Sequence, residues 1–316
     1  SARLVFRNIP GGGVSRGAGP LISLTEEATY HKTTRHRHLL PRKTRPTSPW
    51  MKRFIPFLKS PPTVSVLRLQ GIIAAQARGG ALNDAGLADL IQKAFTKGKP
   101  TAVALAINSP GGSPTQSSLI AARIRRLADE KGIKVYAFVE DVAASGGYYI
   151  ASAADEIWVD RHSVVGSIGV ISAGFGFTDL IERYGIERRV YTAGKSKSML
   201  DPFRPENPDD VTRLKALQEH IHDGFIDHVK TRRGDRLNAD MELFAGDIWV
   251  GDGGIETGLI DGVGHLVPTM KDIFGDKVKF RVFQQKKPLL GRLGAQVTDD
   301  ALGALEDRAA FARFGV

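Results

Sequence analysis

From about residue 63 onward, apolar positions alternate between the spacing of strands and the spacing of helices. Short apolar runs predict strands over 63–69, 102–107, 135–139, 156–159, 164–171 and 189–192. Helical spacing predicts helices between them, including one capped by Asp84, one carrying Leu119, Ile120, Ile124 and Leu127, a long one over 208–233 and a shorter one over 238–244. Because strands and helices alternate, we predict an α/β fold with a mainly parallel sheet and helical crossovers.

The first 60 residues differ from the rest. They lack hydrophobic periodicity and hold twelve Lys or Arg against two Glu, which accounts for the whole net charge of +10. We predict that residues 1–60 form a basic, disordered leader, of which 1–50 precede a start at Met51. The alternative is a basic arm for an anionic surface or RNA. Residues 61–285 are expected to form one domain, and 286–316 a C-terminal tail with a short amphipathic helix.

Composition limits the chemistry of the remaining chain. Its 32 basic and 32 acidic residues balance, so no nucleic-acid partner is expected. The absence of cysteine excludes a thiolate nucleophile and thiolate metal sites. There is no H-E-x-x-H motif, and His220 and His222 would point to different sides of a helix, so no metal or cofactor is predicted. No stretch approaches the roughly 20 apolar residues of a membrane-spanning helix, and no signal peptide is visible.

Ser145 follows the apolar run 135–139 and precedes two glycines at 146–147. A serine at the first turn of a helix presents its hydroxyl, and the glycines leave main-chain N–H groups free for a developing negative charge. A second glycine pair, at 111–112, follows the strand at 102–107. Ligands bind at the carboxyl ends of neighbouring parallel strands. Each motif alone is a common glycine turn, but together they predict an oxyanion site and acyl-transfer chemistry.

The sequence does not point to a histidine as the base for this serine. Ala143 stands where the Gly-x-Ser-x-Gly elbow needs glycine. The histidines are expected in the leader, on a polar solvated helix, or in turns: His31, His36 and His38; His220, His222 and His228; His162 and His265. A buried lysine can serve instead, because desolvation lowers its pKa. The segment 194–200 offers Lys195 and Lys197, and the residues alone leave both open.

Four segments, in this order and spacing, resemble the signal peptide peptidase A family: 108–113, 141–155, 166–170 and 194–200. These are Ser/Lys peptidases of the Clp/crotonase superfamily, and the resemblance covers roughly residues 62–275. It implies a Clp/crotonase-like spiral of repeated ββα units. It also implies a role for each motif residue: Ser145 as nucleophile, Lys197 as base with Lys195 as the weaker candidate, Ser167 orienting the lysine amine, Gly112 and Gly146 as oxyanion donors, and Gly111 and Ser113 beside the substrate.

The same resemblance implies a membrane-associated serine endopeptidase that hydrolyses extended apolar peptides such as cleaved signal peptides. In the family, serine and lysine come from different copies of the domain. This single-copy, half-length chain is therefore expected to form a homo-oligomeric ring with shared active sites, in the bacterial cytoplasm or at the periphery of the cytoplasmic membrane. The chain differs from Clp-type proteases, which carry a histidine after the nucleophile helix. Two other hypotheses are a crotonase-type acyl-CoA enzyme and a non-catalytic oligomeric scaffold at the membrane.

Overall fold

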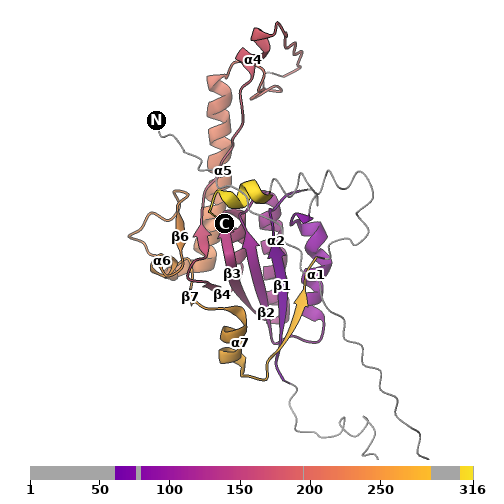
Figure 1. The fold of residues 1–316 in the computed structure, drawn as a ribbon, viewed down its shortest axis with the longest axis vertical. Coiled ribbons are helices and arrows are strands. Elements are labelled where there is room, and N and C mark those ends of the chain that lie inside the picture. The colour runs from indigo at the N-terminus through magenta and orange to yellow at the C-terminus, as the bar shows by residue number, and fades with distance from the viewer. Residues whose placement is uncertain (1–60, 76–79, 195, 286–306, 316) are drawn as a thin grey trace, which may run out of the picture. The chain divides into compact units, whose positions relative to one another are not determined.

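A mostly parallel sheet forms the centre of the fold (Figure 1). The computed structural model describes residues 61–75, 80–194, 196–285 and 307–315. Within them the main path of the sheet runs β6-β5-β3-β2-β1-β8, and β4 pairs with β3 and β7. Every pair is parallel except β5 with β6. The strands are β1 Thr63–Gln70, β2 Ala102–Ser109, β3 Lys134–Ala144, β4 Glu156–Val159, β5 Val164–Gly166, β6 Ile248–Val250, β7 Gly262–Val263 and β8 Lys279–Phe283.

Helices connect the strands, and polar residues fix where the longer ones begin. The helices are α1 Asp84–Thr96, α2 Pro114–Lys131, α3 Gly146–Ala151, α4 Thr178–Arg183, α5 Pro208–Arg233, α6 Gly253–Glu256 and α7 Leu266–Phe274, with a 3₁₀ turn at Gly234–Arg236. The side chain of Asn83 accepts a hydrogen bond from the Gly86 N–H at 2.7 Å, so Asn83, and not Asp84, caps α1. Ser113 and Asn207 cap α2 and α5, and a proline follows each of them.

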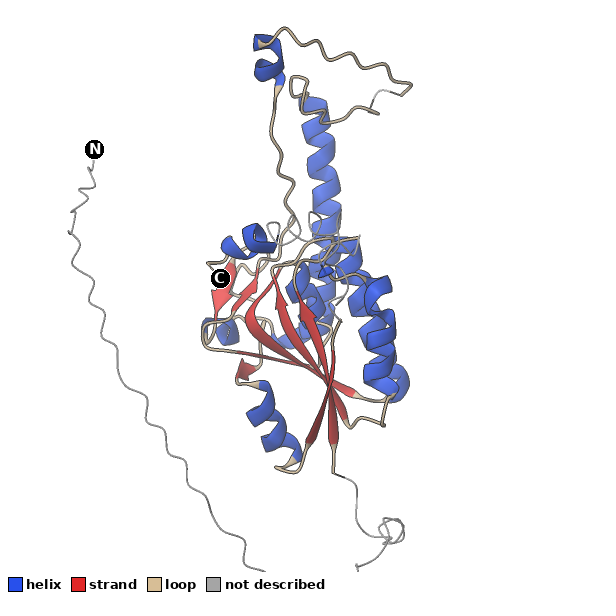
Figure 2. Cartoon of the chain, turned by 45° about the vertical axis from the view of Figure 1, so that its right-hand side comes forward, coloured by secondary structure: helices blue, strands red, loops and turns tan. Residues whose placement is uncertain are grey.

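Both faces of the sheet are covered, which explains the continuous apolar run of β2. Val103, Leu105 and Ile107 pack with residues of α1, α2 and α3 on one face. Ala102, Ala104 and Ala106 face the other way and pack with Met270 of α7. Figure 2 shows these helices on the two sides of the strands. The predicted α/β fold with a mainly parallel sheet and helical crossovers is therefore confirmed.

Three local predictions are wrong. Residues 189–192 form no strand, because they lie in a long exposed stretch with no sheet edge to pair with, and Tyr191 is 91% exposed. Residues 238–244 form turns and bends and no helix. The strand predicted over 164–171 ends at Gly166, whose φ of +99° turns the chain out of the sheet.

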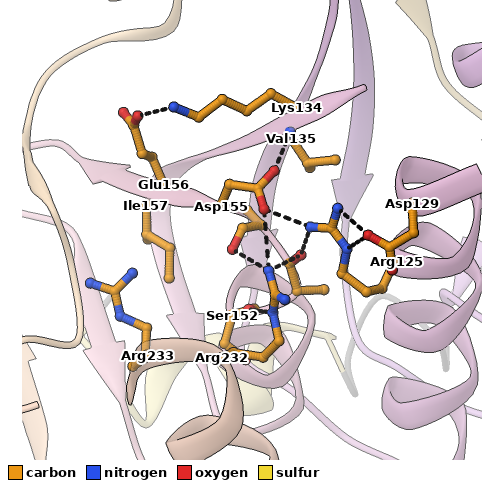
Figure 3. Close-up of polar contacts among 12 residues, drawn as sticks. Arg125, Asp129, Lys134, Val135, Ser152, Asp155, Glu156, Ile157, Arg232 and Arg233 are labelled. Carbon is orange, nitrogen blue, oxygen red and sulfur yellow. Dashed lines mark hydrogen bonds and ion pairs between the residues drawn. The ribbon is translucent and has the colours of Figure 1, made fainter. Parts of the chain in front are cut away.

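The C-terminal end of α5 is joined to the sheet by arginines (Figure 3). Arg232 donates to the carbonyl groups of Ser152, Ala153 and Ala154, which follow α3. Arg125 of α2 donates to Asp155 at 2.7 Å, and the other oxygen of Asp155 accepts the Val135 N–H of β3. These contacts fix one end of α5. Its N-terminal end carries α4 and the loops around it, which lie away from the sheet in Figures 1 and 2.

Near the C-terminus, residues 307–312 are helical. Phe311 and Phe314 pack against a small buried group formed by Val142, Ala144 and Val164 at the ends of β3 and β5. The carboxylate of Asp307 accepts the Ile72 N–H at 3.1 Å. The described end of the chain therefore covers apolar residues beside the carboxyl ends of the central strands.

Candidate active site

Ser145 lies at the sharp turn between β3 and α3. Its backbone has φ +50° and ψ −122°, a conformation that a non-glycine residue rarely adopts. Two hydrogen bonds hold the turn: the Ser145 N–H donates to the Gly166 carbonyl at 2.8 Å, and the Ser145 carbonyl accepts the Tyr149 N–H at 2.9 Å. The side chain is half-buried at the edge of a cavity. A strand, a strained turn and a helix thus present the hydroxyl, although the Gly-x-Ser-x-Gly motif is absent.

The 111–112 glycine pair lies against this turn. Ser109 of β2 pairs with Ala143 of β3, so the residues after the two strands meet. A Cβ placed on Gly111 would lie 2.8 Å from the Gly146 nitrogen and 2.9 Å from the Ser145 Cβ. Such distances leave no room for a side chain, and the positive φ of +102° at Gly111 also favours glycine. Close approach of the two loops therefore requires glycine.

Two main-chain N–H groups are available beside the hydroxyl. Ile73 exchanges hydrogen bonds with the Gly111 carbonyl and the Ser113 N–H, at 2.8 and 2.7 Å. Since successive backbone groups point to opposite sides, the Gly112 N–H faces away from Ile73. A Cβ on Gly146 would lie only 3.4 Å from the Gly112 nitrogen. Within the described residues, neither the Gly112 nor the Gly146 N–H donates to another protein group. Two unpaired donors side by side are what an oxyanion needs.

Gly111 and Ser113, predicted beside the substrate, lie on the same loop, but their groups facing Ile73 are already paired. Ser113 also caps α2 by accepting the Gln116 N–H. Gly112 is the exposed residue of this loop, so its backbone is the part that a substrate strand could still pair with.

Ser167 lies one residue beyond β5. It also has a positive φ, +51°, and its N–H donates to the Asp247 carbonyl at 2.6 Å. Because the preceding Gly166 carbonyl holds the Ser145 N–H, the two serines belong to neighbouring turns at the same edge of the sheet.

Lys197 is not brought to Ser145 within one chain. It is exposed, in a turn held by the hydrogen bond from its N–H to the Gly194 carbonyl at 3.2 Å. The surrounding loops bond among themselves, for example the Phe177 N–H to the Pro202 carbonyl at 2.6 Å. They lie at the N-terminal end of α5 (Figure 1). Lys195 falls outside the described residues. The serine–lysine dyad therefore remains a prediction.

A cavity of about 370 Å³ adjoins Ser145. It lies between α2, α3, the residues after β5, and α5. Of the described residues that line it, none is Asp, Glu, Lys or Arg; the apolar contributors include Leu119, Tyr149, Val170, Ile221 and Phe225. This lining was not predicted from the sequence. The spacing of Ile221 and Phe225, one turn apart on the same helix face, was the available signal.

The expected solvation of the α5 histidines is wrong for two of them. His228 stacks on Tyr149 with ring centroids 3.9 Å apart, and its Nε2–H donates to the Tyr149 carbonyl at 3.1 Å. Burial lowers the pKa of His228 to about 4, although the bond to Tyr149 opposes the shift. His222 Nε2 bonds to the Ile168 carbonyl at 3.0 Å. These two histidines thus attach α5 to α3 and to the residues that follow β5.

The described residues contain no group of three or more His, Asp or Glu side chains placed to hold a metal ion. No helix in the same residues combines the length and apolar character needed to cross a membrane.

Comparisons with known proteins show which family of proteins the chain is similar to. The sequence model of "Peptidase family S49" matches residues 128–273, which include Ser145, Ser167 and Lys197. A putative signal peptide peptidase SppA of Enterococcus faecium is 35% identical over 178 residues, covering 55% of this chain and 51% of that protein. A Brucella melitensis protein named Na⁺/H⁺ antiporter NhaA is 46% identical over 289 residues, covering 84% of this chain and 39% of that protein.

The chain therefore spans about two fifths to one half of these curated relatives. Among solved structures, a membrane-bound stomatin-specific protease in complex with a substrate peptide aligns with a TM-score of 0.46 at 14% identity, covering 79% of this chain and 100% of that one.

Proposed function

The chain belongs to peptidase family S49, and from this premise we propose that it is a serine endopeptidase with Ser145 as its nucleophile. The observation that carries the proposal is the half-buried Ser145 hydroxyl on a positive-φ turn beside the unpaired N–H groups of Gly112 and Gly146. A hydroxyl next to two fixed donors is suited to attack on a peptide carbonyl.

The proposed reaction proceeds through an acyl-enzyme. Ser145 Oγ attacks the scissile carbonyl while its proton passes to a neutral lysine amine. The oxyanion accepts hydrogen bonds from the N–H groups of Gly112 and Gly146. The C–N bond then breaks, and the leaving amine takes the proton from the lysine. Water, deprotonated by the same amine, attacks the acyl carbon; the ester C–O bond breaks, and Ser145 Oγ takes the proton back from the lysine. We assign the base to Lys197, with Ser167 hydrogen-bonded to its amine. An amine that is neutral at physiological pH must be desolvated.

Lys197 is exposed in the single chain, so we propose that it reaches Ser145 from a second copy. From residue 169 to 224 no described apolar residue is buried. This stretch carries large apolar side chains that are 38–91% exposed: Ile171, Phe175, Leu180, Tyr184, Ile186, Tyr191, Leu200, Phe203, Leu217 and Ile221. Apolar surface of this extent is typical of an interface. A homo-oligomeric ring would cover it and desolvate the lysine.

The proposed substrates are extended peptides with apolar side chains, such as cleaved signal peptides. The cavity beside Ser145 has no charged lining among the described residues, so it favours an apolar side chain next to the scissile bond. Peripheral contact of the assembly with the membrane belongs to the same proposal, because such substrates arise there.

The test is a Ser145→Ala variant of the full chain, assayed with fluorogenic apolar peptides and a fluorophosphonate label. We expect hydrolysis to fall at least about 10³-fold and labelling to disappear, with the elution volume in gel filtration unchanged. A matched Thr96→Ala change, which removes a hydroxyl from an exposed position at the end of α1, leaves both readouts intact. Equal activity of the Ser145→Ala variant would contradict the proposal. An unlabelled, inactive wild-type protein would favour the scaffold hypothesis.

A further inference from the structure

The middle of α5 contains a glycine that neither the backbone nor packing explains. Gly224 is an interior residue of this helix, where glycine is destabilising relative to alanine. Its φ is not positive. A Cβ placed on it would meet nothing within 4 Å. By contrast, a Cβ on Gly147 would clash with the Ser109 carbonyl oxygen, so that glycine is sterically required.

Gly224 lines the cavity beside Ser145. Ile221 lies one turn before it and Phe225 directly after it, and both line the same cavity. The space in front of Gly224 is therefore continuous with the apolar space next to the hydroxyl. A larger residue at this position would put its side chain into that space, because its Cβ would enter without a clash.

Ring contacts hold the part of the cavity wall formed by Tyr149 and Phe225, so the cavity cannot easily adapt to a larger residue at 224. The ring of Tyr149 is stacked on His228, and its centroid lies 5.1 Å from the ring centroid of Phe225. Phe225 is only 6% exposed. We propose that Gly224 is a specificity-determining residue that keeps the cavity open to large apolar side chains, such as leucine or phenylalanine. This inference rests on the proposed function, since it assigns the cavity to the substrate residue next to the scissile bond.

The experiment compares the wild type with Gly224→Ala and Gly224→Leu, using peptides that differ only in Leu or Ala before the scissile bond. In Gly224→Leu we expect kcat/KM for the leucine peptide to fall at least about tenfold, with a change of less than about threefold for the alanine peptide. We expect Gly224→Ala to raise the melting temperature. It should change the ratio of kcat/KM between the two peptides less than Gly224→Leu does. The matched control is Asp223→Leu, which adds the same side chain to an exposed neighbour on α5.

A second readout separates this inference from the proposed function. The two peptides are titrated by calorimetry against the Ser145→Ala protein, with and without Gly224→Leu. We expect the leucine-over-alanine preference in binding to fall about tenfold. If the wild type hydrolyses nothing but this loss is seen, the proposed function fails and the role of Gly224 stands. An unchanged preference in both assays, or the same change in Asp223→Leu, would overturn the role of Gly224.

Discussion

Ser145 and Ser167 have positive φ angles of +50° and +51°, and each follows the end of a central strand. A non-glycine residue in such a conformation costs about 1–3 kcal/mol. The cost is offset by the surrounding packing, because Ala143, Ala144 and Gly146 are all buried and fix the chain on both sides of Ser145. Strain at both turns of one sheet edge is consistent with a site that must hold its hydroxyl groups in fixed positions.

His228 should make the stability of the protein depend on pH. Its pKa is lowered to about 4 in the folded state by burial, against about 6.5 in an unfolded chain. Between these values the unfolded state binds the proton and the folded state does not, so stability falls as the pH falls from about 6.5 to 4. The loss at pH 4.5 amounts to as much as about 2 kcal/mol.

This prediction is checked by urea unfolding of the wild type and His228→Phe at pH 7 and pH 4.5. The phenylalanine keeps an aromatic ring beside Tyr149 but carries no titrating group. We expect the free energy of unfolding to fall less between the two pH values in the variant. Identical pH dependence in the two proteins would show that burial of His228 is not linked to stability.

The residues of the site were predictable to different degrees. Ser145 and the glycines at 111–112 could be predicted to meet, because both follow buried parallel strands whose carboxyl ends share one edge. His228 could not be recognised as a buried residue. On a helix of mixed polarity, a histidine that stacks on a tyrosine has the same sequence signature as a solvated one.

Among the elements, α5 connects the site to the exposed region around Lys197, and its arginines fix it to the body. Arg233 is 1% exposed, donates to Asp261 at 2.8 and 3.1 Å, and also donates to the Gly258 carbonyl. Burial by itself raises the pKa of Asp261, but hydrogen bonds and charge from Arg233 outweigh it, and the net shift is downward. The pair thus holds a carboxylate charged in a partly buried position.

Replacing Arg233 by Met should leave Asp261 without its main partner. We expect a loss of about 3 kcal/mol in the free energy of unfolding, since breaking a buried pair leaves an uncompensated charge. Arg213→Met, at an exposed position near the other end of α5, is the control and should change stability little. Both are measured by urea unfolding at pH 7. A loss in Arg233→Met no larger than in the control would contradict this account of how α5 is anchored.

The elements were predictable where periodicity decides the structure. The predicted span of α5 agrees with the helix Pro208–Arg233, because capping by Asn207 and a C-terminal glycine mark both ends. The run at 189–192 has the composition of a strand, but no sheet edge is within reach of it. The composition of 189–192 favours an extended strand, but a strand forms only where it can pair with a neighbouring strand.

For the whole molecule, the unburied stretch from 169 to 224 is the main feature that a single chain leaves unexplained. This stretch is about a quarter of the described residues. It contains many apolar residues, but none of the described ones is buried. Burial of that surface requires a partner, and the incomplete site at Ser145 requires a base. One arrangement, a second copy that brings Lys197 to Ser145, would satisfy both needs. Periodicity and spacing within one chain cannot reveal such a pairing, because the proposed contact lies between chains; only the family resemblance suggests it.

Mixing two inactive variants tests the arrangement directly. Ser145→Ala and Lys197→Ala should each abolish hydrolysis alone. In a randomly mixed oligomer, an intact Ser145 meets an intact Lys197 from a neighbouring chain at about one quarter of the sites. We therefore expect co-expressed, doubly tagged mixtures to recover about a quarter of the wild-type rate. Lys195→Ala serves as the control and stays active without mixing. If mixed oligomers form in gel filtration but remain as inactive as their parts, Lys197 does not complete the site of a neighbouring chain.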